Sequence, residues 1–318
     1  MFTTYNKIED GFDKVVLIDD SSGTFAEVIP SCGAILHSFT IAKAGIEMNV
    51  IDSYNNADEF KNNLATRGFL GSKLSPFACR INKNKYRFAE KDYVIQKLNS
   101  NKIAVHGLIY DRRFIVTSQN STEKKASVQM KYEYRSTDAG FPFDYDCIIT
   151  YELEKENKLN IITEIANKDE KPMPIQDGWH PYFKLDAKID DLQLQFQSKE
   201  MFEFGTDLIP TGKKVIYDGF NSLKNFGDTM LDNSFTINFA EDQPLCVLRN
   251  PDKKIDVEIL PDRSYPYLHI YSPPHRQSIA LENLSALPDS FNNGIGLKIL
   301  SPEQSTTFKT SYKITSLN

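Results

Sequence analysis

Two histidines and one glutamate stand in sequence settings that suit proton transfer. His106 precedes Gly107, and a glycine at a strand end lets another group approach closely. His180 lies between Trp179 and a proline that fixes the backbone, so its ring is more constrained than a surface residue requires. Glu282 ends an apolar run, where a buried acid costs free energy unless it is paired or functional. Side chains of these types are the usual agents of general acid–base catalysis.

Each of these candidates has a structural alternative. Glu282 would equally suit the edge of a strand, with its carboxylate in solvent. The other histidines, His37, His269 and His275, lack a comparable setting, and we interpret them as structural or surface residues. The sequence contains no HExxH or HxH metal spacing and no GxSxG, P-loop or dinucleotide motif. Ser-His-Asp catalysis, which is recognised in space and not by spacing, has no local support.

The elements that must position these residues are predicted to be strands. Apolar and polar residues alternate with period two along most of the chain, so one face of each strand meets a core. The polar run 154–158 predicts a hairpin turn. Helical signal is confined to residues 57–65, with Ser53 or Asn55 as the cap. The clearest alternating segments are 128–134, 149–153, 159–165, 192–196, 255–259 and 308–314.

Residues 1–318 are predicted to form a single all-β domain, a large antiparallel β-sandwich. No linker rich in Pro, Gly or Ser divides the strands, and all-β domains often reach this length as one unit. A barrel or a propeller is the alternative architecture, but the sequence contains no blade-length repeat. Most of the 21 Phe and 15 Tyr are expected to fill the core of such a sandwich.

Charge and cysteine usage restrict the partners and the compartment. The net charge of −6 disfavours nucleic acid and anionic membranes, which both reward a basic face. We find no apolar stretch long enough to span a membrane and no secretory signal. The four cysteines form no close pair, which favours buried free thiols over disulfides. We expect a cytoplasmic monomer or homodimer that binds a small molecule and neither nucleic acid nor membrane.

Several segments of the chain resemble, in order, the galactose mutarotase family, also known as the aldose 1-epimerases. The most specific is 179–183, Trp-His-Pro-Tyr-Phe, around the second active-site histidine. The resemblance covers roughly residues 30 to 315, and the family fold is a large antiparallel β-sandwich, in agreement with the period-two pattern. The other matching segments are 33–36, 75–81, 105–107, 231–235, 280–282 with 288, 289 and 292, and 296–303.

The resemblance implies an enzyme that interconverts the α and β anomers of a hexose by opening and closing the sugar ring. One group removes a proton from the C1 hydroxyl and another delivers a proton to the ring oxygen. By this resemblance Glu282 is the base and His180 the acid, and the two exchange roles on ring closure. Neither a metal nor an organic cofactor is required.

The resemblance also implies residues that hold the sugar. Arg80 and His106 would hydrogen-bond near the ring oxygen and the neighbouring hydroxyls. Asp232 would accept hydrogen bonds from distal hydroxyls. Trp179 would pack on the sugar or hold the ring of His180 in place.

Two departures from the family pattern bear on sugar specificity more than on the chemistry. Cys79 stands where the family often has Asn, and Asn283 where it often has Pro. A subgroup of the family acts on hexose 6-phosphates, for which Lys184, Arg112 or Arg113 would supply a phosphate contact, although basic residues are common on any surface. The remaining alternatives are a glycosidase or lyase of the same superfamily and a non-catalytic carbohydrate-binding protein of the same fold.

Overall fold

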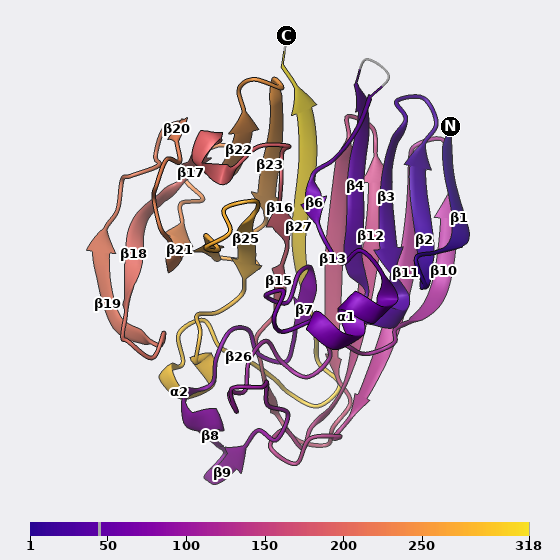
Figure 1. The fold of residues 1–318 in the computed structure, drawn as a ribbon. Helices are drawn as coiled ribbons and strands as arrows, with labels where there is room; N and C mark the ends of the chain where they lie inside the picture. The colour runs from indigo at the N-terminus through magenta and orange to yellow at the C-terminus, as the bar shows by residue number, and fades with distance from the viewer. Residues whose placement is uncertain (44–45, 318) are drawn as a thin grey trace.

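The N-terminal sheet of this protein lies against a longer central sheet. The computed structural model describes residues 1–43 and 46–317, and Figure 1 shows β1 to β4 in front of β10 to β13. Across this interface the hydroxyl of Tyr151 donates a hydrogen bond of 3.0 Å to the carbonyl of Ala34. The antiparallel order is β1 (Phe2–Glu9), β2 (Phe12–Asp19), β3 (Thr24–Ile29), β4 (Ile35–Lys43) and β5 (Ile46–Asn49).

The central sheet contains the strands that the alternating pattern predicted most clearly. The predicted turn at 154–158 is confirmed, because Glu156 and Asn157 take positive φ angles of 61° and 52° between two paired strands. The inward residues of these strands are buried and the outward ones are partly exposed. The order is β10 (Ile115–Ser121), β11 (Lys125–Arg135), β12 (Asp144–Glu154), β13 (Lys158–Asn167), β27 (Ser305–Ser316), β23 (Ile255–Pro261), β22 (Cys246–Asn250), β17 (Gln193–Phe196) and β20 (Lys224–Asn225).

A third sheet, which we call the site sheet, covers the other part of the central sheet. Its short middle strands come from distant parts of the chain, and its described strands pair antiparallel throughout. The order is β19 (Pro210–Ile216), β18 (Ser198–Phe204), β21 (Asp232–Ile237), β24 (Tyr267–Tyr271), β25 (Ile279–Leu284), β15 (Gly178–His180) and β7 (Ser72–Leu74), and β16 (Tyr182–Phe183) joins β25 to β6 (Ile51–Asp52).

The helices are short, as the sequence indicated. Helix α1 (Ala57–Asn63) buries Phe60, but its cap is Asn56, whose side chain accepts a hydrogen bond of 2.8 Å from the Glu59 amide. The predicted caps Ser53 and Asn55 are therefore wrong, because the backbone turns into the helix one residue later than Asn55. The other small elements are α2 (Ser290–Asn293), the ribbon of β8 (Lys85–Phe88) and β9 (Lys91–Val94), and the ribbon of β14 (Met173–Ile175) and β26 (Lys298–Leu300).

Aromatic side chains fill the space between the central sheet and the site sheet. The rings of Phe183 and Tyr312 lie 5.2 Å apart, and those of Tyr151 and Trp179 lie 5.9 Å apart. The four cysteines are buried and carry free thiols, as predicted. The prediction of an all-β antiparallel sandwich is confirmed. No helix within the described residues is long and apolar enough to cross a membrane.

Candidate active site

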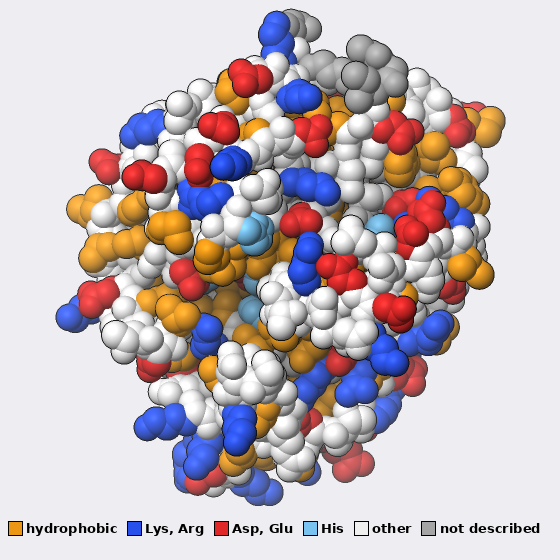
Figure 2. Space-filling model, viewed as in Figure 1, with side chains coloured by type: hydrophobic (Ala, Val, Ile, Leu, Met, Phe, Trp, Pro, Cys, Tyr) orange, Lys and Arg blue, Asp and Glu red, His pale blue; other side chains and the backbone are white. Residues whose placement is uncertain are grey.

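A pocket of about 460 Å³ opens between the site sheet and loops from the N-terminal half of the chain. Figure 2 shows it as a hollow near the middle of this face, with histidine side chains at its floor. Its volume lies in the range that small-molecule sites occupy. Its lining includes Cys79, Arg80, His106, His180, Asp232, His269 and Glu282.

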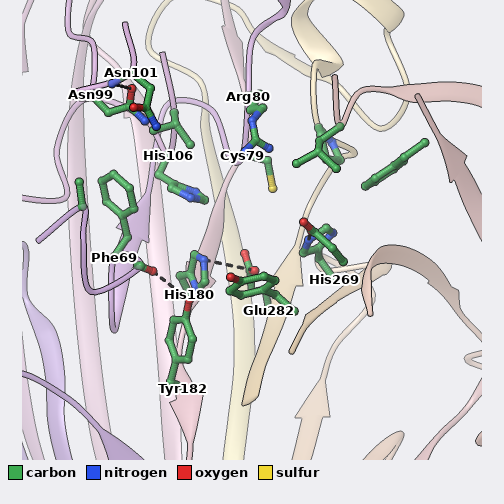
Figure 3. A pocket seen from close by; sticks show the side chains of 18 residues that line it. Phe69, Cys79, Arg80, Asn99, Asn101, His106, His180, Tyr182, His269 and Glu282 are labelled. Carbon is green, nitrogen blue, oxygen red and sulfur yellow. Dashed lines mark hydrogen bonds and ion pairs between the residues drawn. The ribbon is translucent and has the colours of Figure 1, made fainter. Parts of the chain in front are cut away.

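Glu282 and His180 meet at the floor of this pocket. Glu282 lies on β25 and is 1% exposed, while His180 ends β15 and is 5% exposed. Residues of β15 and β7 on one side and β24 on the other hold β25 in register. The His180 Nε2 atom lies 3.4 Å from the Glu282 Oε1 atom, and Figure 3 shows the two side chains facing each other. An imidazole and a carboxyl group at this distance can exchange or share a proton.

Burial moves the titration of both groups in opposite directions. Removal from water raises the pKa of Glu282 to about 8, an effect that the nearby His269 partly offsets. Burial, together with the nearby His269, lowers the pKa of His180 to about 3. Between these values the pair holds one proton in total, which can lie on the carboxyl or on the imidazole. The site is therefore equipped to take up one proton and to give up one proton at neutral pH.

His106 and Arg80 reach the pocket from two paired loop segments. The amide of His106 donates a hydrogen bond of 2.8 Å to the carbonyl of Cys79, the neighbour of Arg80. Gly107 forms a bridge with Ser75, and a side chain at this glycine would overlap the Ser75 carbonyl, so the close approach predicted at Gly107 is confirmed. Both side chains therefore point into the pocket because two segments of backbone pack directly against each other (Figure 3).

The ring of His106 lies beside that of His180, with 4.9 Å between the ring centres. Burial, together with His180 and Arg80, holds the pKa of His106 well below its ordinary value. His106 is therefore a neutral hydrogen-bonding group that lines the same pocket as Glu282 and His180. Arg80 carries the fixed positive charge of this wall of the pocket.

Asp232 lies at the start of β21 and is held by a histidine that the sequence analysis treated as structural. The Nε2 atom of His269 lies 3.1 Å from Asp232 Oδ1, and its Nδ1 atom lies 2.8 Å from Ser234 Oγ. His269 on β24 is the direct cross-strand partner of Glu282 on β25. The alternation of Tyr267, His269 and Tyr271 is typical of a strand. The strand pairing that brings His269 to Glu282 leaves no local mark in the sequence.

Three buried polar atoms of the site have no hydrogen-bond partner within the described protein. They are Nδ1 of His106, Nδ1 of His180 and Oε2 of Glu282. Buried polar atoms are normally paired, so unpaired ones need an explanation such as a bound polar ligand. Among the described residues, no group of three or more His, Cys, Asp or Glu side chains is arranged to hold a metal ion.

Trp179 is the predicted site residue that does not line the pocket. It is 3% exposed, and its ring packs between Tyr151 and the ammonium of Lys73, which lies 4.5 Å from the ring centre. Successive side chains of a strand point to opposite faces, so on β15 the same geometry that sends His180 into the pocket sends Trp179 into the core. The expectation that Trp179 packs on a sugar is wrong. The alternative role, holding His180 in place, stays a prediction.

The residues considered for specificity fall into two groups. Cys79 lines the pocket, whereas the side chain of Asn283 accepts a hydrogen bond of 2.7 Å from Thr310 in the core. The basic residues considered for a phosphate contact, Lys184, Arg112 and Arg113, are absent from the pocket lining that the structure describes. Arg80 is the one Lys or Arg in that described lining.

The chain matches the profile of one protein family over nearly its whole length. The profile of the aldose 1-epimerase family matches residues 14–313. The chain belongs to the aldose 1-epimerase family.

Curated relatives of the chain are distant. The aldose 1-epimerase of Streptococcus thermophilus is 27% identical over 223 residues, which cover 68% of this chain and 62% of that protein. The maltose epimerase of Levilactobacillus brevis is 23% identical over 267 residues, which cover 78% of this chain and 76% of the relative. The uncharacterized protein YihR of Escherichia coli is 24% identical over 236 residues, which cover 73% of this chain and 74% of YihR.

Solved structures share the fold at low sequence identity. A galactose mutarotase-like protein from Clostridium acetobutylicum has a TM-score of 0.88 at 16% identity, with 99% of each chain covered. Galactose 1-epimerase from Lactobacillus acidophilus has a TM-score of 0.81 at 19% identity, with 100% of this chain and 99% of the other covered. These likenesses show that the chain has the galactose mutarotase-like fold.

Proposed function

We propose that this protein is a mutarotase that interconverts the α and β anomers of a free hexose. The observation that carries the proposal is the pair of Glu282 and His180, 3.4 Å apart at the floor of the pocket. Mutarotation needs one proton removed and one delivered at two oxygens bonded to the same carbon. A pair that holds a single proton supplies both functions at once, and the family of the chain is consistent with this chemistry.

Ring opening starts from the carboxylate of Glu282 and the imidazolium of His180. Glu282 takes the proton of the C1 hydroxyl, and the C1–O1 bond becomes a carbonyl. The bond between C1 and the ring oxygen breaks, its electron pair goes to the ring oxygen, and His180 supplies the proton there. Rotation about C1–C2 presents the other face of the aldehyde. Closure reverses the transfers, so that Glu282 protonates O1, His180 takes the proton of the attacking hydroxyl, and the pair regains its starting form.

The remaining pocket residues hold the sugar in this account. His106 and Arg80 would bond the ring oxygen and neighbouring hydroxyls, and Asp232 would accept from distal hydroxyls. The described pocket lining contains one Lys or Arg side chain, Arg80, and two carboxyl groups, those of Asp232 and Glu282. This distribution of charge favours a neutral sugar over a phosphorylated one. The four buried free thiols fit a reducing compartment, and we propose the cytoplasm.

Polarimetry on freshly dissolved α-D-galactose and α-D-glucose tests the function, with hexose 6-phosphates assayed in parallel by a coupled dehydrogenase. The wild-type protein should accelerate mutarotation of at least one free hexose. Glu282→Gln and His180→Asn should each lower kcat by at least about 10²-fold, the usual scale for one lost acid–base group. His275→Gln, at an exposed histidine outside the pocket, is the matched control and should leave the rate unchanged.

Rival functions give other results in the same assay. Sugar binding by calorimetry without faster mutarotation would show a non-catalytic binding protein. Release of reducing ends from oligosaccharides would show a glycosidase, which requires a pair of carboxyl groups at the cleaved bond. Near wild-type rates in both Glu282→Gln and His180→Asn would remove these residues from the mechanism.

A further inference from the structure

His269 is a buried pocket histidine to which the proposed mechanism assigns no step. It is 5% exposed, and each ring nitrogen has a hydrogen-bond partner: Nε2 lies 3.1 Å from Asp232 Oδ1 and Nδ1 lies 2.8 Å from Ser234 Oγ. An ionised carboxylate accepts hydrogen bonds and does not donate them, so Nε2 carries a proton. The hydroxyl oxygen of Ser234 can accept a hydrogen bond from a protonated Nδ1. Both N–H groups of a charged imidazolium are thus provided with acceptors.

The surrounding charges favour this charged form of His269. Burial alone would lower its pKa, but the hydrogen bond to Asp232 and the charges of Glu282 and Asp232 raise the pKa above the ordinary value. Burial likewise opposes ionisation of Asp232, yet the hydrogen bond to His269 leaves the pKa of that carboxyl lowered. The two shifts are in the directions that a salt bridge between His269 and Asp232 requires.

Strand pairing places this positive charge next to the catalytic glutamate. His269 and Glu282 are direct partners in the antiparallel pair of β24 and β25, and both side chains line the same pocket. Directly opposite residues on one face have Cβ atoms about 4.5–5.5 Å apart. An opposite charge at about 4–6 Å favours the ionised form of a carboxyl group. Figure 3 shows Glu282 lying between His180 on one side and His269 on the other.

Apart from Arg80 on the opposite wall, the other described groups around the pair carry no lasting positive charge. Burial keeps His106 uncharged, because its pKa is well below the ordinary value, and burial raises the pKa values of Cys79, Tyr182 and Tyr271, so these remain neutral too. The titratable and charged groups facing His269 and Glu282 are Asp232 on β21, Tyr271 on β24, His180 on β15, Tyr182 on β16, and Cys79, Arg80 and His106 from the loop segments.

We propose that His269 is a positioning residue for the catalytic proton. Its imidazolium, held between Ser234 and Asp232, stabilises the carboxylate of Glu282 more than it repels a proton on His180, because Glu282 is its direct strand partner and lies between the two rings. It thereby increases the fraction of the pair in which the shared proton lies on His180. That arrangement, carboxylate and imidazolium, is the one from which ring opening starts. The inference deepens the proposed function and rests on it for its catalytic consequence, but the placement of the proton is a property of the sugar-free protein.

His269→Gln tests the proposal, because glutamine keeps a neutral hydrogen-bond donor toward Asp232 and removes the charge. The protein without sugar is titrated by infrared difference spectroscopy, in which the band of the protonated Glu282 carboxyl is identified by its loss in Glu282→Gln. In His269→Gln this band should persist to higher pH by about one unit, the lower end of the effect of one neighbouring charge. In ¹⁵N-histidine NMR, the wild-type signal that disappears in His269→Gln should be that of an imidazolium at pH 7.

The kinetic consequence is a lower kcat with a smaller change in KM. Mutarotation at pH 7 should fall about tenfold in His269→Gln, because one pKa unit corresponds to a tenfold change in the population of the reactive form. The fall in rate at high pH should also move to higher pH by about one unit, a change that a merely misfolded variant would not show. His275→Gln is the control for the loss of a histidine and should match the wild type in all three measurements.

A second, milder variant keeps the proposal testable if His269→Gln does not fold. Ser234→Ala removes the acceptor of Nδ1 without touching the pocket, since Ser234 does not line it, and should shift the Glu282 band in the same direction by a smaller amount. An unchanged Glu282 band in both variants would overturn the proposal, even if activity falls. A rise in KM with an unmoved pH profile would also contradict it. If no aldose is turned over but the band shifts, the function proposed above fails while the placement of the proton by His269 stands.

Discussion

Removal from water determines the pKa values of Glu282 and His180 more than their residue types do. A free glutamate would be fully ionised at neutral pH and a free histidine would be mostly neutral. Burial raises the pKa of Glu282 to about 8 and lowers that of His180 to about 3. One proton then stays on the pair over a wide range of pH, which is what a reaction that takes and returns a proton in each half requires.

The pH dependence of mutarotation follows from this pair. The rate should be nearly constant through the acidic and neutral range and should fall as the pH rises through about 8, because the pair then loses its only proton and no acid remains for the ring oxygen. On the acidic side, loss through a second proton on the pair is expected only near pH 3, where His180 and the carboxyl are both protonated. Polarimetric rates from pH 5 to 10, corrected with a Glu282→Gln blank for catalysis by hydroxide, measure this fall in rate at high pH. A corrected rate that keeps rising above pH 9 would contradict a one-proton pair.

Residue types and neighbours in the sequence were informative for some site residues and silent for others. His106, His180 and Glu282 stood out because glycine, proline or an apolar run beside them is unusual for a surface residue. His269 did not stand out, because its partners Asp232 and Ser234 come from another strand and meet it only when β21 pairs with β24. Trp179 was expected at the sugar because it precedes His180 in the matching segment. Of these two neighbours on β15, only His180 faces the pocket.

At the scale of elements, the site is built by the alternation of short strands and by two loop segments in direct contact. Alternation on β15 and β25 separates a pocket face, with His180 and Glu282, from a core face, with Trp179 and Asn283. The period-two pattern predicted such strands but not their neighbours. The contact of the loop segments depends on Gly107, which has a φ of +83° and leaves no room for a side chain against Ser75.

Gly107→Ala should destabilise the protein and separate the loops that carry Arg80 and His106. The positive φ and the overlap with the Ser75 carbonyl together should lower the free energy of unfolding by about 2 kcal/mol or more. The matched control is Gly212→Ala, at a glycine with a similar φ of +85° and no atom within 4 Å, which carries the backbone strain without the overlap. Urea denaturation of both variants measures the difference. An equal decrease in the free energy of unfolding in the two variants would show that the overlap with Ser75 costs no stability.

At the scale of the whole molecule, the sandwich joins residues that lie far apart in the sequence. Sheet order places β15 and β25 side by side although about a hundred residues separate them, and β7 completes the same edge. The alternating pattern was sufficient to predict an antiparallel sandwich, because that prediction needs only buried and exposed faces. The order of strands depends on long-range packing of the core, which no local pattern records. That residues 1–318 form a single domain stays a prediction.

The measurement that tests the central claim most directly is a double-mutant cycle on the two residues that this sheet order brings together. Glu282→Gln, His180→Asn and the double variant are compared with the wild type in kcat for mutarotation of the best free hexose. Groups that act as one unit are strongly non-additive, so the double variant should be about as slow as the slower single variant. A double variant slowed by the full product of the two single effects would mean that Glu282 and His180 act independently, and the shared proton would be contradicted.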